Sequence, residues 1–153
     1  VGEPGKGWAQ VTSELAYERS GPERFLSAYR VFVELVRICG DQPTSEQAAA
    51  IGRIASHFMT LRRMSISVAG MLEQGKDVVG EAALVKGLGN NFEKLLPEIA
   101  RTVVPDLSLE NPEAQRLFRQ TFEETMLLSP SFTLRGGTRE ILRGVIARGL
   151  GLR

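Results

Sequence analysis

Two segments near opposite ends of the sequence carry residues that could do chemistry. Near the start, Glu18-Arg19 precedes a Gly-Pro pair at residues 21–22, and a carboxylate beside such a break could face a pocket and act as a general base. Near the end, residues 135–153 hold five arginines and one glutamate, and Gly-Gly-Thr at residues 136–138 stands at a helix start. Backbone N–H groups left free at a helix start bind anions. The alternatives are a solvated ion pair on a helix and a basic helix exposed at the end of the chain.

The remaining reactive residue types predict no metal or nucleotide site. His57 is the only histidine and Cys39 the only cysteine, so a metal ion would lack most of its usual ligands. We expect a partly exposed His57 on a helix and an inert Cys39 thiol at a helix end. Gly2, Gly5 and Gly7 lie too close together for a dinucleotide-binding fingerprint, and no P-loop, HExxH or CxxC motif occurs.

The composition is that of an ordinary folded domain. Hydrophobic residues make up 42% and charged residues 24% of the 153 residues, which argues against disorder. A net charge of +1 gives no reason to expect nucleic acid as a partner, and no apolar run of about eighteen residues predicts a membrane span. A single cysteine fits a reducing compartment, so we expect a cytoplasmic protein. The start, VGEPGKGW, has neither a signal pattern nor an initiator methionine, which suggests a piece of a longer chain.

Apolar residues at three- and four-residue spacing predict helices along most of the chain. The first runs over about residues 8–39 and is broken or bent near residue 21, because Pro22 cannot continue a helix without a kink. The second starts at a capping box formed by Thr44 and Gln47 and ends at Gly75. The stripes of these helices include Trp8, Val11 and Leu15 in the first, and Ile51, Ile54, Phe58, Leu61, Ser65, Val68 and Leu72 in the second.

A third helix is predicted from Asp77 or Gly80 to Val104. Pro97 falls inside it and should bend it, because proline removes one backbone hydrogen bond. A loop follows over residues 105–112. The apolar stripe of this helix consists of Val85, Leu88, Phe92, Leu95 and Ile99.

Two shorter helices close the chain. Asn111 caps the first of them, Ser-Pro-Ser at residues 129–131 breaks it, and Thr138 caps the last. No stretch alternates as a strand does. We therefore predict one all-α domain over residues 1–153, an up-down four-helix-type bundle with an additional short C-terminal helix. The faces expected to be buried are Leu117 or Phe118, Phe122 and Met126, and then Ile141, Leu142, Val145 and Ile146.

Three stretches taken together resemble one protein family. SFTLRGGTREILRGVIARGLGLR (131–153) resembles the C-terminal signature of the acyl-CoA dehydrogenases, in which a Gly-Thr-x-Glu/Gln-Ile-x-Arg run opens the last helix. VGEPGKGW (1–8) with ELAYER (14–19) resembles the exit from the family's middle β-domain, and AALVKGLGNNFEKLLPEIAR (82–101) resembles a helix in between. The resemblance covers the whole chain and is most specific at its two ends. It implies the C-terminal helical-bundle domain of such an enzyme, without the N-terminal helical and middle β-domains.

The resemblance also implies a reaction and partners. In the family, FAD oxidises an acyl-CoA thioester to the trans-2-enoyl-CoA: a carboxylate removes the α-proton, and the β-hydrogen leaves as hydride to the flavin. The implied partners are acyl-CoA, an electron-transfer flavoprotein or similar acceptor, and other subunits of a homo- or hetero-oligomer. We expect these residues to fold alone but not to turn over, because a bundle on one side of a flavin cannot exclude water from the reaction.

The resemblance further implies catalytic roles. Many members carry the catalytic glutamate directly before the Gly-Thr pair, where this sequence has Gly136. A subset, including isovaleryl-type and long-chain enzymes, carries the base on the first bundle helix before an arginine, and Glu18-Arg19 matches that position. Glu18 is then the base and Arg19 the charge that keeps it ionised, with Glu23-Arg24 as the rival pair. The Gly136 N–H would polarise the thioester carbonyl.

Cofactor binding is implied only in part. Gly137, Thr138 and Glu140 match positions that approach the flavin. Two family motifs that hold the FAD of a neighbouring subunit, Arg-x-x-Phe-Gly and Gln-x-Phe-Gly-Gly, are absent, and the corresponding stretches read ICGDQPTSEQ (38–47) and TVVPDLSLEN (102–111). Three possibilities follow: a homo-oligomer with different contacts, a partner subunit with an incomplete FAD site in a mixed oligomer, and a non-catalytic helical interaction domain.

Overall fold

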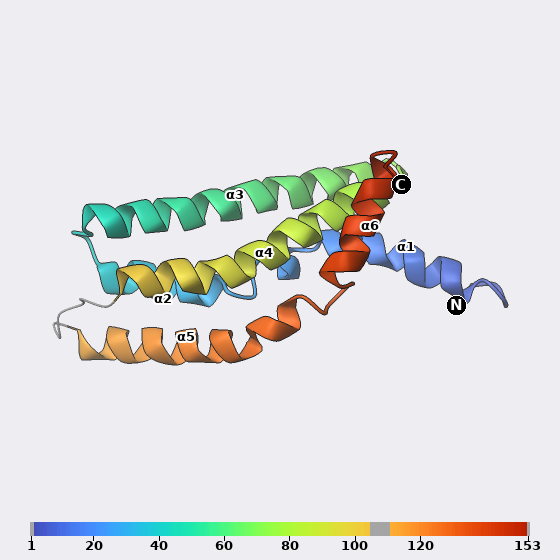
Figure 1. Ribbon diagram of the computed structural model, residues 1–153. Coiled ribbons are helices and arrows are strands. Elements are labelled where there is room, and N and C mark those ends of the chain that lie inside the picture. Colours follow the sequence, from blue (N-terminus) through green and yellow to red (C-terminus); the bar gives the residue numbers. More distant parts are fainter. Residues whose placement is uncertain (1, 105–110, 153) are drawn as a thin grey trace.

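The computed structural model describes residues 2–104 and 111–152, which form helices joined by short connections (Figure 1). No strand occurs within these two ranges. The prediction of an all-α helical bundle is therefore confirmed. In chain order the helices are α1 (Gly7–Ser20), α2 (Tyr29–Cys39), α3 (Ser45–Glu73), α4 (Val79–Val103), α5 (Pro112–Phe132) and α6 (Arg139–Gly149), with a 3₁₀ turn η1 (Pro22–Arg24) between the first two.

Helix α4 is the centre of the bundle and packs against every other helix. Figure 1 shows α3 along one side of it, α5 along the other, and α6 crossing its N-terminal half. The reason is the apolar face of α4, since Val85, Phe92 and Ile99 are buried as their spacing predicts. The Phe92 ring meets Phe58 of α3 edge-on, with 4.7 Å between the ring centroids.

Helices α3, α5 and α6 begin where the sequence predicts. Thr44 accepts a hydrogen bond from the Gln47 N–H, and the Gln47 side chain accepts one from the Thr44 N–H, which completes the capping box of α3. Asn111 caps α5 by accepting from the Ala114 N–H at 3.1 Å. Thr138 is the cap residue of α6, without a side-chain bond to the backbone of that helix.

The first predicted helix is two helices in the structure. Helix α1 ends at Ser20, Pro22 begins the 3₁₀ turn, and α2 starts only at Tyr29. The predicted break near residue 21 is confirmed, but it is wider than one kink. It extends to residue 28 because Phe25 and Ala28 turn inward and are buried in the core.

The predicted break of α5 at residues 129–131 is wrong, because the helix continues to Phe132. Pro130 has no N–H to donate to the carbonyl of Met126, four residues earlier. The Ser129 hydroxyl donates to that carbonyl instead, at 3.1 Å. The serine that suggested a break therefore replaces the hydrogen bond that the proline removes. Helix α4 likewise runs through Pro97 without interruption.

Several residues of the predicted apolar stripes face solvent. Trp8, Leu88, Met126 and Ile141 are exposed, because spacing places a side chain on a helix face but does not determine whether another element covers that face. The predicted loop over residues 105–112 lies outside the described residues except for its last two, and the second of these begins α5. Of the helices described here, none combines the length and the hydropathy of a membrane-spanning segment.

Candidate active site

The structure brings together the two segments that the sequence pattern singles out. Glu18 and Arg19 lie in the last turn of α1, and Gly136 lies in the turn between α5 and α6. Arg19 Nε donates to the Gly136 carbonyl at 2.9 Å, across a separation of 117 positions in the chain. A Cβ atom on Gly136 would lie 3.3 Å from Glu18 Oε1. The end of α1 and the turn before α6 therefore form one site.

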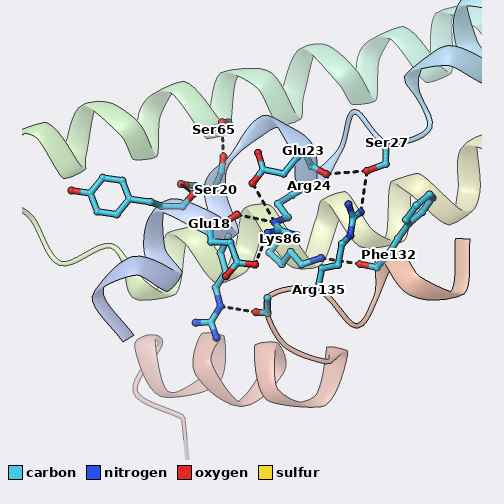
Figure 2. Close-up of polar contacts among 12 residues, drawn as sticks. Glu18, Ser20, Glu23, Arg24, Ser27, Ser65, Lys86, Phe132 and Arg135 are labelled. Carbon is cyan, nitrogen blue, oxygen red and sulfur yellow. Dashed lines mark hydrogen bonds and ion pairs between the residues drawn. The ribbon is translucent and has the colours of Figure 1, made fainter. Parts of the chain in front are cut away.

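The arginine paired with the Glu18 carboxylate is Arg24. Its Nη2 atom donates to Glu18 Oε1 at 2.5 Å, and its Nε donates to the Glu18 backbone carbonyl at 2.8 Å (Figure 2). Glu23 Oε1 lies 3.5 Å from the same Nε. The acids of the two rival pairs, Glu18 and Glu23, therefore both lie against Arg24, while Arg19 binds the Gly136 carbonyl. Of the two acids, Glu18 is the one found against the Gly136 position.

The residues expected near a flavin lie at the start of α6, beside Arg19. Gly136 and Gly137 have φ angles of +68° and +114°, which glycine adopts without the steric cost of a side chain. In the described part of the chain no acceptor binds their N–H groups, so these donors can serve a ligand oxygen. Next to them, the Glu140 backbone N–H and the Thr138 hydroxyl lower the pKa of the Glu140 carboxyl.

A fully buried lysine lies beneath this turn. Lys86 of α4 is 0% exposed, and its Nζ donates to the Phe132 carbonyl at 2.9 Å and to Asn90 Oδ1. Its Cε would lie 3.5 Å from a Cβ on Gly136. Lysine is almost never fully buried unless it is paired, and here two oxygens meet that requirement.

The pKa of Lys86 is lowered to about 8. Burial is the largest cause, because the ammonium loses its hydration, and the charges of Arg24 and Arg135 act in the same direction. The carboxylates of Glu93 and Glu18 oppose the shift. The ammonium therefore sits in surroundings that on balance disfavour its charge.

A second buried charge, Glu93, ties the same turn to α4. Arg135 Nη2 donates to Glu93 Oε2 at 3.1 Å and to Ser27 Oγ at 3.0 Å, and the Ser27 N–H donates to Glu93 Oε1 at 3.0 Å. Burial raises the pKa of Glu93, and its bonds with Ser27 and the charge of Arg135 offset part of that rise. The Arg135 guanidinium also lies over the Phe132 ring, 4.9 Å from its centroid. The residue next to Gly136 is thus held from two sides.

The spacing of polar residues in the sequence indicates these buried charges, although the apolar stripes do not. Lys86, Asn90 and Glu93 follow one another at four- and three-residue spacing and so share one face of a helix. Polar groups on a face that packs inward need hydrogen-bond partners, so this spacing indicates a polar segment docked on α4. Arg24 and Arg135 lie outside the long helices and carry no such periodic signal.

His57 and Cys39 have structural surroundings. The His57 ring stacks on Phe92, with 5.0 Å between ring centroids. Cys39 is buried, and burial raises the pKa of its thiol. A smaller fraction of the thiol is therefore present as the reactive thiolate. Residues 2–104 and 111–152 contain no group of three or more histidine, cysteine or acidic side chains that could hold a metal ion.

No model of a known protein family matches this chain, and neither a curated protein nor a solved structure does. The function is therefore inferred from the site geometry together with the residue pattern.

Gly136→Ala should destabilise the protein more than Gly75→Ala. Both glycines have φ near +70°, so each substitution costs about 1–2 kcal/mol of backbone strain. Only at position 136 does the new Cβ also meet Glu18 Oε1 at 3.3 Å, whereas nothing lies within 4 Å of a Cβ at position 75. Urea unfolding of both variants measures the difference, and equal losses would contradict the close contact with Glu18.

Lys86 should make the free energy of unfolding rise with pH between about 8 and 10.5. In that interval the unfolded chain, in which the lysine has its ordinary pKa, binds more protons than the folded protein does, so folding becomes more favourable as pH rises. Comparing urea unfolding of the wild type and Lys86→Met across this range isolates the contribution of Lys86. The variant should lack this rise, and identical pH profiles would be inconsistent with the lowered pKa.

Proposed function

We propose that this chain is the C-terminal helical domain of an FAD-dependent acyl-CoA dehydrogenase, in which Glu18 removes the α-proton of the acyl thioester. The observation that carries the proposal is the meeting of the last turn of α1 with the turn before α6. Glu18 Oε1 lies 3.3 Å from the Cβ position of Gly136, and Arg19 binds the carbonyl of that glycine. The resemblance assigns the base and the thioester-polarising N–H to these two segments, which are 117 positions apart.

The Glu18 carboxylate is both accessible to a ligand and held in position, as a general base must be. Its side chain is 42% exposed, while its partner Arg24 is 6% exposed and holds Oε1. The α-proton of a thioester is far less acidic than a carboxylic acid, so proton removal requires a positioned base and a polarised carbonyl. The Gly136 N–H lies in the turn that Glu18 contacts. Donated to the thioester oxygen, it stabilises the negative charge that develops there as the proton leaves.

We infer that a bound flavin would lie at the start of α6. A Cβ at position 136 would lie 3.3 Å from Glu18 Oε1, and one at position 137 would lie 3.5 Å from Arg19 Nη2, so the two glycines keep these side chains close to the turn. Gly137 would hold the cofactor through its backbone N–H, and Thr138 and Glu140, whose hydroxyl and N–H bind the Glu140 carboxyl, would border it. Bound FAD supplies the acceptor for the hydride from the β-carbon. Glu18 takes the α-proton, and the loss of both hydrogens leaves the trans-2-enoyl thioester.

Exposed apolar side chains suggest where other parts of such an enzyme contact this domain. Trp8 and Leu127 are 81% and 82% exposed, and Leu134 is 69% exposed. Large apolar side chains in such positions favour contact with further protein. In the proposed enzyme they face other domains or subunits, and we expect the assembly to act in the cytoplasm and to pass electrons to an electron-transfer flavoprotein or a similar acceptor.

The second candidate function is a partner subunit with an incomplete FAD site in a mixed oligomer. It is favoured by the stretches 38–47 and 102–111, which lack the arginine and the glutamine of the family motifs.

A cavity of about 340 Å³ borders these stretches, and Arg101 and Arg119 are among its lining residues. Arginine binds phosphate groups well, so this cavity supports the alternative of a homo-oligomer with different cofactor contacts.

Glu18→Gln in the full-length enzyme should lower turnover about a hundredfold or more, because the amide cannot accept the α-proton. Glu23→Gln is the matched control, since Glu23 also lies against Arg24, and it should stay within about tenfold of the wild type. The measurement is bleaching of the flavin absorbance by straight and branched acyl-CoA thioesters. If the Glu18→Gln enzyme turned over within about tenfold of the wild type, Glu18 would not be the base.

The full-length protein purified alone should bind one FAD per chain if it forms its own complete sites. The stoichiometry follows from the flavin and protein absorbance of the purified protein. One FAD per chain would rule out the partner-subunit function. Protein that binds FAD only after a sister subunit is added would instead support it.

A further inference from the structure

We propose that Lys86 is a positioning residue of this site: its ammonium holds the turn between α5 and α6 in the shape that sets Gly136 against Glu18. Where it concerns turnover, the proposal rests on the proposed function. Its geometric part stands independently, because it concerns contacts within the fold.

Lys86 is bonded to the residue before the turn and lies beneath the glycine within it. Its Nζ donates at 2.9 Å to the carbonyl of Phe132, the last residue of α5. Its Cε would lie 3.5 Å from a Cβ on Gly136. The Lys86 side chain therefore binds the last residue of α5 and lies beneath Gly136. The length of this side chain sets the spacing between Phe132 and Gly136.

The other side chains that hold the turn act elsewhere on it. Arg135 links the turn to Ser27 and Glu93, and Arg19 binds the Gly136 carbonyl. Figure 2 shows Lys86 reaching the Phe132 carbonyl from α4 while Arg135 extends toward Ser27. Neither arginine is hydrogen-bonded to the Phe132 carbonyl, so removal of Lys86 leaves only the contact between Arg135 and the Phe132 ring to link the end of α5 with Glu93 of α4.

The charge of Lys86 is not explained by stability. Its surroundings include Glu18 from α1, Arg24 from η1, Glu93 from α4 and Arg135 from the turn, and together with burial they bring its pKa to about 8. Surroundings that lower the pKa of a lysine disfavour the ammonium relative to the neutral amine. The ammonium nevertheless lies 2.9 Å from the Phe132 carbonyl and donates to it, so the residue joins α4 to the end of α5 at the cost of burying its charge.

Amide hydrogen exchange of the full-length protein, read by mass spectrometry, tests the geometric part. The amides of Leu134 and Leu142 are hydrogen-bonded in the turn and at the start of α6. Lys86→Met should speed exchange in peptides covering these residues about tenfold at neutral pH. Exchange in α3 should be unchanged, and Lys94→Met, at an exposed lysine two turns further along α4, is the matched control.

The pH dependence separates a held turn from a packing defect. Opening the turn returns Lys86 to water, where its pKa is higher, so opening of the wild-type turn becomes less favourable as pH rises above about 8. The ratio of exchange rates between Lys86→Met and wild type should therefore grow in that range. Equal exchange of the two proteins at neutral pH, or a ratio that stays constant with pH, would overturn the proposal. If the variant does not fold, the wild type alone suffices: exchange in the turn, corrected for the intrinsic exchange rate, should slow above pH 8, and a corrected rate that does not change with pH would overturn the proposal.

The kinetic part uses the same variant in the full-length enzyme. Because the Gly136 N–H acts on charge that develops in the transition state, Lys86→Met should lower kcat and kcat/KM by the same factor and leave KM unchanged. A rise in KM alone would contradict a positioning role in catalysis. If Lys86→Met speeds exchange in the turn but Glu18→Gln leaves turnover unchanged, the proposed function is refuted and the role of Lys86 in the fold stands. If Glu18→Gln abolishes turnover but Lys86→Met leaves exchange in the turn unchanged, the role of Lys86 is refuted and the proposed function stands.

Discussion

Two opposite charges buried on one face of α4 constrain the rest of this structure. Lys86 and Glu93 are both 0% exposed, and a charge removed from water destabilises the fold unless other groups bind it. Lys86 is bound by the end of α5, and Glu93 is bound by Ser27 and by the turn that follows α5. Satisfying one helix face therefore draws two distant parts of the chain onto α4. The apolar core stabilises the bundle, but these bonds determine which irregular segments meet on it.

The irregular segments of the chain are the ones that make the site. The connection after α1 contributes Arg24, which is bound to Glu18, and the turn after α5 contributes Gly136, whose carbonyl Arg19 binds. A side chain at position 136 would meet the Glu18 carboxylate, so the glycine is what allows the approach. The site is thus a consequence of the buried charges of α4: once they hold the connections in place, an exposed carboxylate and free backbone donors lie side by side.

The charges around Glu18 distinguish the proposed enzyme from the alternative of a passive interaction domain. Glu18 is an accessible acid surrounded by basic side chains of Arg19, Arg24 and Lys86. Such an arrangement favours negative charge on a ligand held beside it. A domain that only packs against other proteins has no need of this arrangement, although the exposed apolar side chains of α1 and α5 show that contact with further protein is compatible with the fold. The reaction proposed above, proton abstraction next to a thioester, rests on this geometry taken together with the resemblance.

The sequence by itself determined the helices and most of their ends. The apolar spacing of α3 and α4, the capping box at Thr44 and the Asn111 cap depend on residues within a few positions of one another, and such local chemistry can be recognised in the sequence. The continuation of α5 through Pro130 was missed because the Ser129 hydroxyl had two possible roles, ending the helix or repairing it. Only the tertiary structure decided that Arg24 is bound to Glu18 and that Lys86 and Arg135 hold the turn at Gly136. These contacts join residues far apart in the chain, and their partners are chosen by the packing of α4 and by the need of buried charges for hydrogen bonds, which no local spacing encodes.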